Sequence, residues 1–150
     1  MYVGEAIRVV QWASGSMGRT AMRMVIDHAN MDLVGTLVYS ARKHGIDVGE
    51  IARRPVSGVL ATNNIDDILR TDADVVLHMP RITLPYEALV PDVVRLLESG
   101  KNVISTAGFH WPDAHGELYA GPLRAAAIRG NAPLAGVGVN PGMVAERLVM

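Results

Sequence analysis

The sequence predicts an α/β domain whose core is a doubly wound parallel sheet, and three observations point to that class. Short runs of β-branched residues alternate with stretches of helical periodicity along the 150 residues. Alternation of this kind is typical of parallel strands joined by right-handed crossovers. The content of hydrophobic residues, 49%, suits strands that are buried on both faces. A flavodoxin-like arrangement of the same elements is the alternative.

The predicted strands are short and apolar. They are residues 7–12, 33–39, 58–61, 74–79, 102–105 and 134–139. The predicted helices cover residues 18–28, 85–99 and 121–129, with a short helix that Thr62 or Asn63 caps and that runs to Leu69. Pro85 in a first turn and Gly100 after a last turn are typical helix boundaries. The polar residues 40–55 indicate no particular element, and residues 143–150 resemble the start of another helix.

Composition excludes several classes of function. A length of 150 residues fits one domain, residues 1–150, and a net charge of -1 argues against a nucleic-acid partner or an acidic membrane surface. The absence of cysteine excludes disulfides and thiolate sites, and the five histidines have no metal-ligand spacing, so we expect no metal. The N-terminus carries Glu5 and no basic stretch, and no apolar run reaches the ~20 residues of a membrane span. We therefore expect a soluble, cytoplasmic protein without a membrane partner.

The loop after the first strand, Ala13-Ser14-Gly15-Ser16-Met17-Gly18, has the spacing of a dinucleotide-binding turn. In such a turn the middle glycine lets the backbone approach a pyrophosphate, and the last lets the helix pack against the strand. Ala13 stands where a first glycine is usual, which we expect to change the turn only slightly. The loop predicts a Rossmann-type domain in which the start of the helix holds the phosphates. Those contacts are expected from Gly15, Ser16, Met17 and Gly18. A plain strand–helix connection is the alternative.

The end of the second strand favours NADP(H) over NAD(H). NAD-specific domains place an acidic residue there for the ribose hydroxyls, ~20 residues after the glycines. This chain has no acid at that place and instead has Ser40, Arg42 and Lys43, which suit a 2′-phosphate. A solvated basic turn without a ligand is the alternative.

The carboxyl ends of three later strands are expected to line the same crevice. We expect cofactor contacts there from Met79, Pro80, Ser105, Thr106 and Asn140, although ordinary turn roles are equally open.

Two histidines near these strand ends have different interpretations. His78 lies within an apolar strand and is interpreted as a core residue. His110, in a polar and aromatic loop with Phe109 and Trp111, is the candidate proton donor, and simple exposure is the alternative. Phe109 and Trp111 are expected to form an apolar wall for a substrate or the interface with a second domain.

The segment VVQWASGSMG of residues 9–18, the turn of residues 38–40 and the stretch GVGVNPG of residues 136–142 carry a family resemblance. They resemble the N-terminal domain of the dihydrodipicolinate-reductase-like proteins, in particular the 2,4-diaminopentanoate dehydrogenase and native amine dehydrogenase branch. The resemblance implies an NAD(P)H-dependent oxidoreductase that reduces a ketone-derived imine or a carbonyl, or that oxidises an amine. It also implies a C-terminal α/β domain, absent from this chain, that completes the substrate pocket and forms a homodimer.

One position departs from the family pattern. Amine dehydrogenases of this group carry a Glu shortly after the fifth strand, whereas residues 106–109 contain no acid and Asp113 and Glu117 follow later. The resemblance places the family's phosphate roles on residues 15–18 and its 2′-phosphate roles on Ser40, Arg42 and Lys43. An NADP(H)-binding module without catalysis of its own is the alternative function, and an α/β domain that binds no nucleotide is the third.

Overall fold

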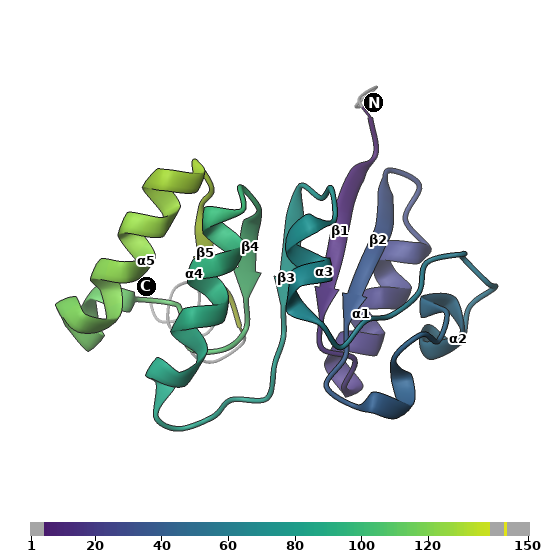
Figure 1. Ribbon diagram of the computed structural model, residues 1–150, viewed down its shortest axis with the longest axis horizontal. Coiled ribbons are helices and arrows are strands. Elements are labelled where there is room, and N and C mark those ends of the chain that lie inside the picture. Colours follow the sequence, from purple (N-terminus) through teal and green to yellow (C-terminus); the bar gives the residue numbers. More distant parts are fainter. Residues whose placement is uncertain (1–4, 139–142, 144–150) are drawn as a thin grey trace. The chain divides into compact units, whose positions relative to one another are not determined.

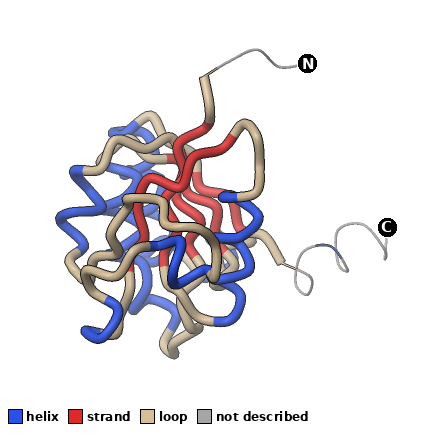
Figure 2. Tube along the Cα trace, turned by 90° about the vertical axis from the view of Figure 1, so that its right-hand side faces the viewer, coloured by secondary structure: helices blue, strands red, loops and turns tan. Residues whose placement is uncertain are grey.

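The computed structural model describes residues 5–138 and residue 143. The chain divides into two compact units, Met1–Met79 and Pro80–Met150, each with its own strands and helices (Figure 1). Helices and strands alternate along the chain, as the blue and red segments of the trace show (Figure 2). Within the described ranges no helix is both long and apolar enough to cross a bilayer.

Three parallel strands form the centre of the first unit: β1 (Ile7–Trp12), β2 (Met31–Leu37) and β3 (Val75–His78). β1 lies between the other two and pairs with both (Figure 1). The bounds of β1 are those predicted, and the other two strands differ from the prediction by one or two residues at each end. Because the strands are parallel, their carboxyl ends meet at one edge, where ligands bind in sheets of this type.

Helices α1 (Ser16–Ile26) and α3 (Ile65–Arg70) cover opposite faces of this sheet. Val9 belongs to a buried cluster that includes side chains of α1. The next residue, Val10, and a side chain of α3 both lie within 3.5 Å of the position that a Cβ on Gly35 would occupy. Neighbouring residues of a strand point to opposite faces, so the sheet is covered on both sides, as the predicted class requires.

The predicted strand over residues 58–61 is wrong. Leu60 makes only an isolated antiparallel bridge with Asp47. Asp47 is the N-cap of α2 (Val48–Ala52), where its carboxylate accepts a hydrogen bond from the amide of Gly49 at 2.7 Å. The segment facing residues 58–61 therefore turns into a helix after one bridge, and no strand ladder can extend there.

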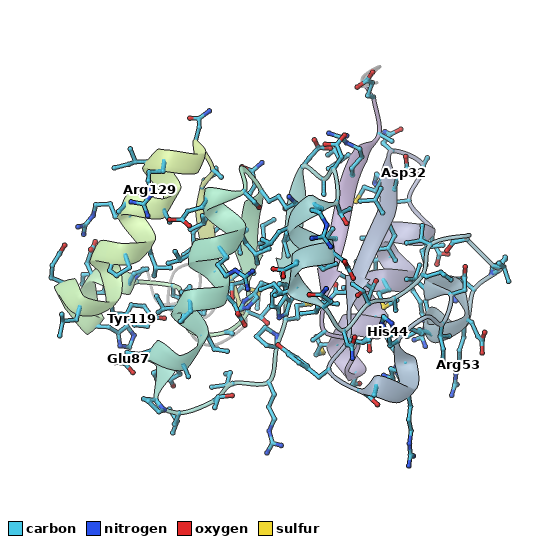
Figure 3. All side chains as sticks on the ribbon, in the orientation of Figure 1. Asp32, His44, Arg53, Glu87, Tyr119 and Arg129 are labelled. Atoms are coloured by element: carbon cyan, nitrogen blue, oxygen red, sulfur yellow. The ribbon has the colours of Figure 1, made fainter. Side chains whose placement is uncertain are left out.

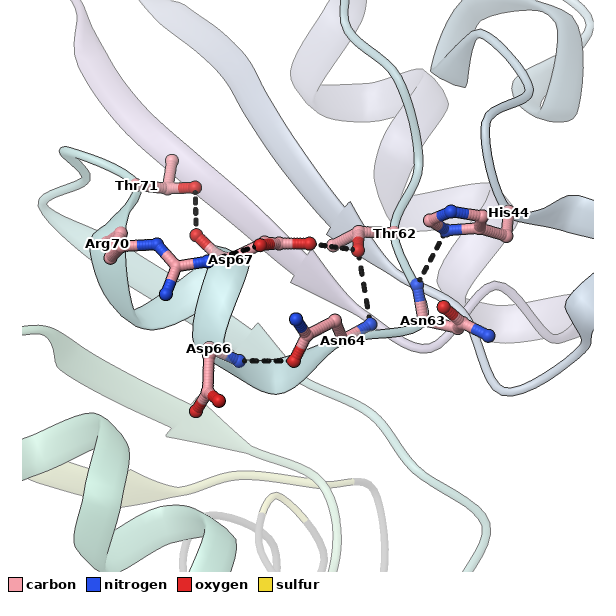
Figure 4. A network of polar contacts seen from close by, with 8 residues as sticks. All are labelled: His44, Thr62, Asn63, Asn64, Asp66, Asp67, Arg70 and Thr71. Atoms are coloured by element: carbon pink, nitrogen blue, oxygen red, sulfur yellow. Dashed lines mark hydrogen bonds and ion pairs between the residues drawn. The ribbon is translucent and has the colours of Figure 1, made fainter.

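The predicted cap of α3 is also wrong, because Asn64 takes that role instead of Thr62 or Asn63. The side-chain oxygen of Asn64 accepts a hydrogen bond from the amide of Asp66 at 3.0 Å. Thr62 instead donates its hydroxyl to Asp67 at 2.7 Å and accepts the amide of Asn64 at 3.1 Å (Figure 4). The Thr62 hydroxyl is the main reason that the pKa of Asp67 lies below its ordinary value. This network fixes the chain where it enters α3.

Among the residues that the structure describes, the second unit has two short parallel strands and two α-helices. They are β4 (Asn102–Ser105), α4 (Val90–Glu98), α5 (Glu117–Gly130) and β5 (Leu134–Gly136). β4 has the predicted bounds, whereas β5 ends three residues before the predicted end, and residue 139 lies outside the described residues. The two helices pack closely, because a Cβ on Gly130 would overlap the backbone of Leu97.

The predicted starts of both helices in this unit are wrong, and a proline is involved in each case. The first turn of the helix predicted over residues 85–99 is instead a separate 3₁₀ turn, η2 (Tyr86–Leu89). Pro91 lies in the first turn of α4 and has no N–H to continue an α-helical ladder, so the helix begins anew there. Helix α5 was predicted to start beside Pro122, but it starts directly after Gly116 and contains that proline. The φ of +86° at Gly116 favours glycine and sets that boundary.

Candidate functional site

The loop between β1 and α1 leaves the first amides of the helix without side-chain partners. Gly15 is the N-cap of α1, no side chain caps the helix, and its first turn carries no acidic residue. The first N–H groups of a helix have no acceptor within it, and the helix dipole places partial positive charge at this end. Ser16 and Met17 are exposed. The backbone that is predicted to hold phosphates is therefore accessible to an anion.

The two glycines of the loop are required for different reasons. A Cβ on Gly18 would overlap the carbonyl oxygen of Ala13, so α1 could not pack this close to the strand with any other residue. Gly15 has φ -69°, which every residue adopts, and apart from its two chain neighbours no described residue comes within 4 Å of where its Cβ would be. The fold therefore requires glycine at 18 but not at 15, and the open space beside Gly15 is where a bound phosphate needs room.

Ala13 adopts a left-handed backbone conformation with φ +73°. We expected alanine to change the turn only slightly, but this conformation costs an L-residue about 1–2 kcal/mol. The amide of Ala13 donates to the carbonyl of Leu37 at 3.0 Å, and its own carbonyl accepts from the side chain of Gln11 at 3.0 Å. The turn thus keeps the shape that a first glycine would give, at a cost in strain.

The basic turn after β2 reaches the glycine loop through Lys43. This turn is a short 3₁₀ helix, η1 (Ala41–Lys43), with Ser40 as its N-cap. The ammonium group of Lys43 donates to both the carbonyl and the hydroxyl oxygen of Ser14, each at 3.0 Å. Ser40 and Arg42 are exposed, and within residues 5–138 neither side chain makes a hydrogen bond. The structure brings Lys43 to the loop and leaves Arg42 exposed to solvent.

Sequence reasoning assigned no role to Gln11 and Tyr39, although both lie at this edge. Gln11 is fully buried in β1. The ring nitrogen of the buried Trp12 donates to the hydroxyl of Tyr39 at 2.8 Å, while the Tyr39 side chain is 63% exposed. A glutamine within an apolar strand, next to the loop, is the sequence signal that could have drawn attention to Gln11.

At the end of β3, His78 is buried in the core, whereas the next residue, Met79, is half-buried. His78 is fully buried with its ring 5.6 Å from that of Trp12, and burial lowers its pKa to about 4. It is therefore a neutral core residue at pH 7, as interpreted from the sequence. The amide of Met79 donates to the carbonyl of Trp12 at 3.2 Å, which ties the end of β3 to the end of β1.

The remaining predicted contact residues belong to the second unit. Ser105 is fully buried and its hydroxyl accepts a hydrogen bond from the amide of Ala107 at 3.1 Å, which is turn chemistry. Thr106 is half-buried and Pro80 is buried. Asn140 lies outside the described residues.

The loop after β4 leads into an aromatic cluster. Phe109 is buried and stacks on Tyr119 of α5 with ring centroids 5.8 Å apart, whereas Trp111 is exposed. Burial, with a smaller contribution from the nearby Glu87, raises the pKa of Tyr119 to about 12 (Figure 3). The Nε2 atom of His110 is buried and has no hydrogen-bond partner among residues 5–138. Phe109 is thus a core residue, and the Nε2 atom of His110 is a buried polar atom without a hydrogen bond to any described residue.

Solved structures define the class of this fold. Amine dehydrogenase from Mycobacterium smegmatis matches 88% of this chain and 39% of its own, with a TM-score of 0.81 and 23% identity. GenD2 from gentamicin A biosynthesis, solved with NAD, matches 91% of this chain and 35% of its own, with a TM-score of 0.64 and 22% identity. Biliverdin reductase from Synechocystis, solved with biliverdin and NADP+, matches 89% and 38%, with a TM-score of 0.63 and 16% identity. The predicted Rossmann-type α/β class is confirmed.

A family model narrows this class. The model of the dihydrodipicolinate reductase N-terminus matches residues 8–115, and the chain belongs to that family. The chain is 30% identical over 139 residues to an amine dehydrogenase from Streptomyces virginiae, across 91% of this chain and 39% of that protein. It is 39% identical over 79 residues to 4-hydroxy-tetrahydrodipicolinate reductase from Lactiplantibacillus plantarum, across 53% of this chain and 29% of that protein. The predicted family is confirmed, and the chain spans less than half the length of these relatives.

Proposed function

We propose that this chain is the NADP(H)-binding domain of an oxidoreductase that acts on a small ketone-derived imine, a carbonyl or the corresponding amine. The observation that carries the proposal is the open start of α1, where Gly15 is a glycine that the fold itself does not need. A pyrophosphate there accepts hydrogen bonds from the amides of Ser16, Met17 and Gly18. The helix dipole and the ammonium group of Lys43 add positive charge beside it.

Preference for NADP(H) over NAD(H) is attributed to the turn that begins at Ser40. The exposed guanidinium of Arg42 pairs with a 2′-phosphate, and the hydroxyl of Ser40 donates a hydrogen bond to it. Lys43 contributes charge from a fixed position against Ser14. No carboxylate lies in residues 38–43 that could repel the phosphate or select the ribose hydroxyls of NAD(H) instead.

The reaction is proposed from the activities that name the relatives, an amine dehydrogenase and a reductase. When bound, the nicotinamide supplies the hydride, and the protein fixes its orientation and handles the proton. We assign the role of proton donor to His110, whose buried Nε2 has no hydrogen-bond partner within the described residues. The nicotinamide end is assigned to Met79, Pro80, Thr106 and Asn140, whereas Ser105 is left to its turn, where its buried hydroxyl accepts from the amide of Ala107.

The relatives also support a larger assembly. Since the chain covers 39% of the Streptomyces virginiae amine dehydrogenase, we propose a C-terminal domain that closes the substrate pocket and forms a homodimer in the cytoplasm.

The test is a fluorescence titration of the 150-residue chain with NADPH and with NADH, followed by turnover assays. We expect a dissociation constant for NADPH at least tenfold below that for NADH. Turnover is assayed on the chain joined to the C-terminal domain, with small ketones plus ammonia and with primary amines. Equal or reversed affinities would overturn the NADP(H) assignment, and no binding of either dinucleotide would overturn the proposal as a whole.

A nucleotide-binding module without catalysis is the second candidate. It is favoured by the lack of an acid in residues 106–109, where the amine dehydrogenases that the chain resembles carry a Glu. This function predicts tight NADPH binding with no oxidation of NADPH by any carbonyl and ammonia pair.

A further inference from the structure

Gln11 lies next to the start of the glycine loop and holds the last carbonyl of β1 and the first carbonyl of the loop. The side chain is fully buried, and its Nε2 atom donates to the carbonyl of Trp12 at 2.9 Å and to that of Ala13 at 3.0 Å. Both acceptors are oxygens, so the nitrogen end of the amide must face them, since the opposite orientation would set three oxygens against one another. The oxygen end, Oε1, is buried without a hydrogen-bond partner among residues 5–138. Within the described residues, the Gln11 side chain therefore makes its hydrogen bonds only to the carbonyls of Trp12 and Ala13.

The carbonyl of Ala13, which Gln11 holds, belongs to the residue with the strained backbone conformation. Ala13 has φ +73°, a conformation that glycine adopts freely and that alanine resists. Its carbonyl oxygen lies directly against Gly18, where a Cβ would overlap it, and so it sets how α1 packs on the strand. If this peptide relaxed, its carbonyl would rotate and the start of α1 would move with it. The amides of residues 16–18 would then change direction.

We propose that Gln11 is a positioning residue that takes over the role of the missing first glycine. Its amide holds Ala13 in the left-handed conformation and thereby aims the amides at the start of α1 at a dinucleotide pyrophosphate. The inference rests on the proposed dinucleotide function, but the anchoring itself does not require a ligand. Gln11 touches neither the phosphates nor the reacting atoms and acts only through the turn.

The test is a double-mutant cycle that combines Gln11→Met with Ala13→Gly. Methionine has a similar length but no donor, whereas glycine removes the strain that the donor offsets. NADPH dissociation constants are measured by fluorescence. Without ligand, exchange is measured for the amides of Ala13 and Arg19, which donate hydrogen bonds to the carbonyls of Leu37 and Gly15 on either side of the turn. Thr36→Val is the matched control, because Thr36 is equally buried in the neighbouring strand and its hydroxyl has no partner within residues 5–138.

We expect Gln11→Met to weaken NADPH binding at least tenfold and to speed amide exchange in the loop. Adding Ala13→Gly should bring affinity back to within threefold of the parent, while Ala13→Gly alone and Thr36→Val change it less than threefold. A folded Gln11→Met variant with unchanged affinity would overturn the inference while the proposed function stands. So would a double mutant no better than Gln11→Met.

If Gln11→Met does not fold, the double mutant decides whether Gln11 anchors the turn. A folded double mutant that binds within threefold of the parent supports the anchor, and an unfolded or weakly binding one contradicts it. If the parent itself binds no dinucleotide, the proposed function fails. The ligand-free exchange data then still decide whether Gln11 anchors the turn.

Discussion

Replacing Gly15 with alanine separates what the fold needs from what a ligand needs. Apart from the two adjacent residues, nothing in the described part of the chain comes within 4 Å of the new Cβ, and φ -69° is open to alanine. Alanine lowers the entropy of the unfolded chain, which stabilises by about 0.4–1 kcal/mol. It is a poorer N-cap than glycine by a similar amount, about 0.5–1 kcal/mol. The two effects offset, so the free energy of unfolding should change by less than about 1 kcal/mol, or about 2–4 °C in Tm.

Binding should respond far more strongly to the same change. The methyl group stands where a pyrophosphate approaches the backbone, and the phosphates must retreat from the amides of residues 16–18. Loss of one hydrogen bond to a charged group costs about 1.5–3 kcal/mol. That loss corresponds to a dissociation constant raised about 10- to 100-fold. Urea unfolding and NADPH titration of the same preparation measure both effects.

Gly18→Ala is the matched control, because its Cβ overlaps the carbonyl of Ala13. This variant should lose both stability, by about 1–3 kcal/mol, and affinity. A Gly15→Ala variant that binds NADPH as tightly as the parent would refute the claim that the open space at residue 15 is needed by the ligand.

Two further predictions follow from the same unit. Arg42→Ala should raise the dissociation constant for NADPH about tenfold and leave that for NADH within twofold, since only NADPH carries the 2′-phosphate; equal losses for both would contradict the assignment. Burial lowers the pKa of His78 to about 4, so between pH 6.5 and pH 4 the unfolded chain binds a proton that the folded chain does not. Stability should therefore fall as the pH drops, by about 2 kcal/mol between pH 7 and pH 5 in urea unfolding. His78→Gln should lose this dependence, and a variant with the same slope would show that other groups cause it.

The parts of the fold that the sequence predicts well are those fixed by local pattern. The bounds of β1 and β4 follow from short apolar runs, and the loop at Gly15 and Gly18 follows from spacing within a strand–helix connection. Residues 58–61 have the same apolar character as a strand, but their neighbour begins a helix at Asp47. A strand needs a partner, and no local pattern contains that information.

The parts of the site that sequence reasoning missed depend on contacts between distant residues. The bond from Lys43 to Ser14 joins two loops 29 residues apart, and it places a cation at the phosphate loop rather than only at the end of β2. The left-handed conformation of Ala13 is a property of the turn, so the substitution of alanine for glycine looked harmless in the sequence. Gln11 could have been noticed as a polar residue among the apolar side chains at the end of β1, but its acceptors could not have been predicted.

An NMR titration with NADPH shows whether the backbone amides at the start of α1 hold a dinucleotide pyrophosphate. We expect the largest amide shifts on Ser16, Met17 and Gly18, with a second group at residues 40–43. Saturating NADPH that leaves these amides unshifted, or that shifts only residues elsewhere, would contradict this binding mode.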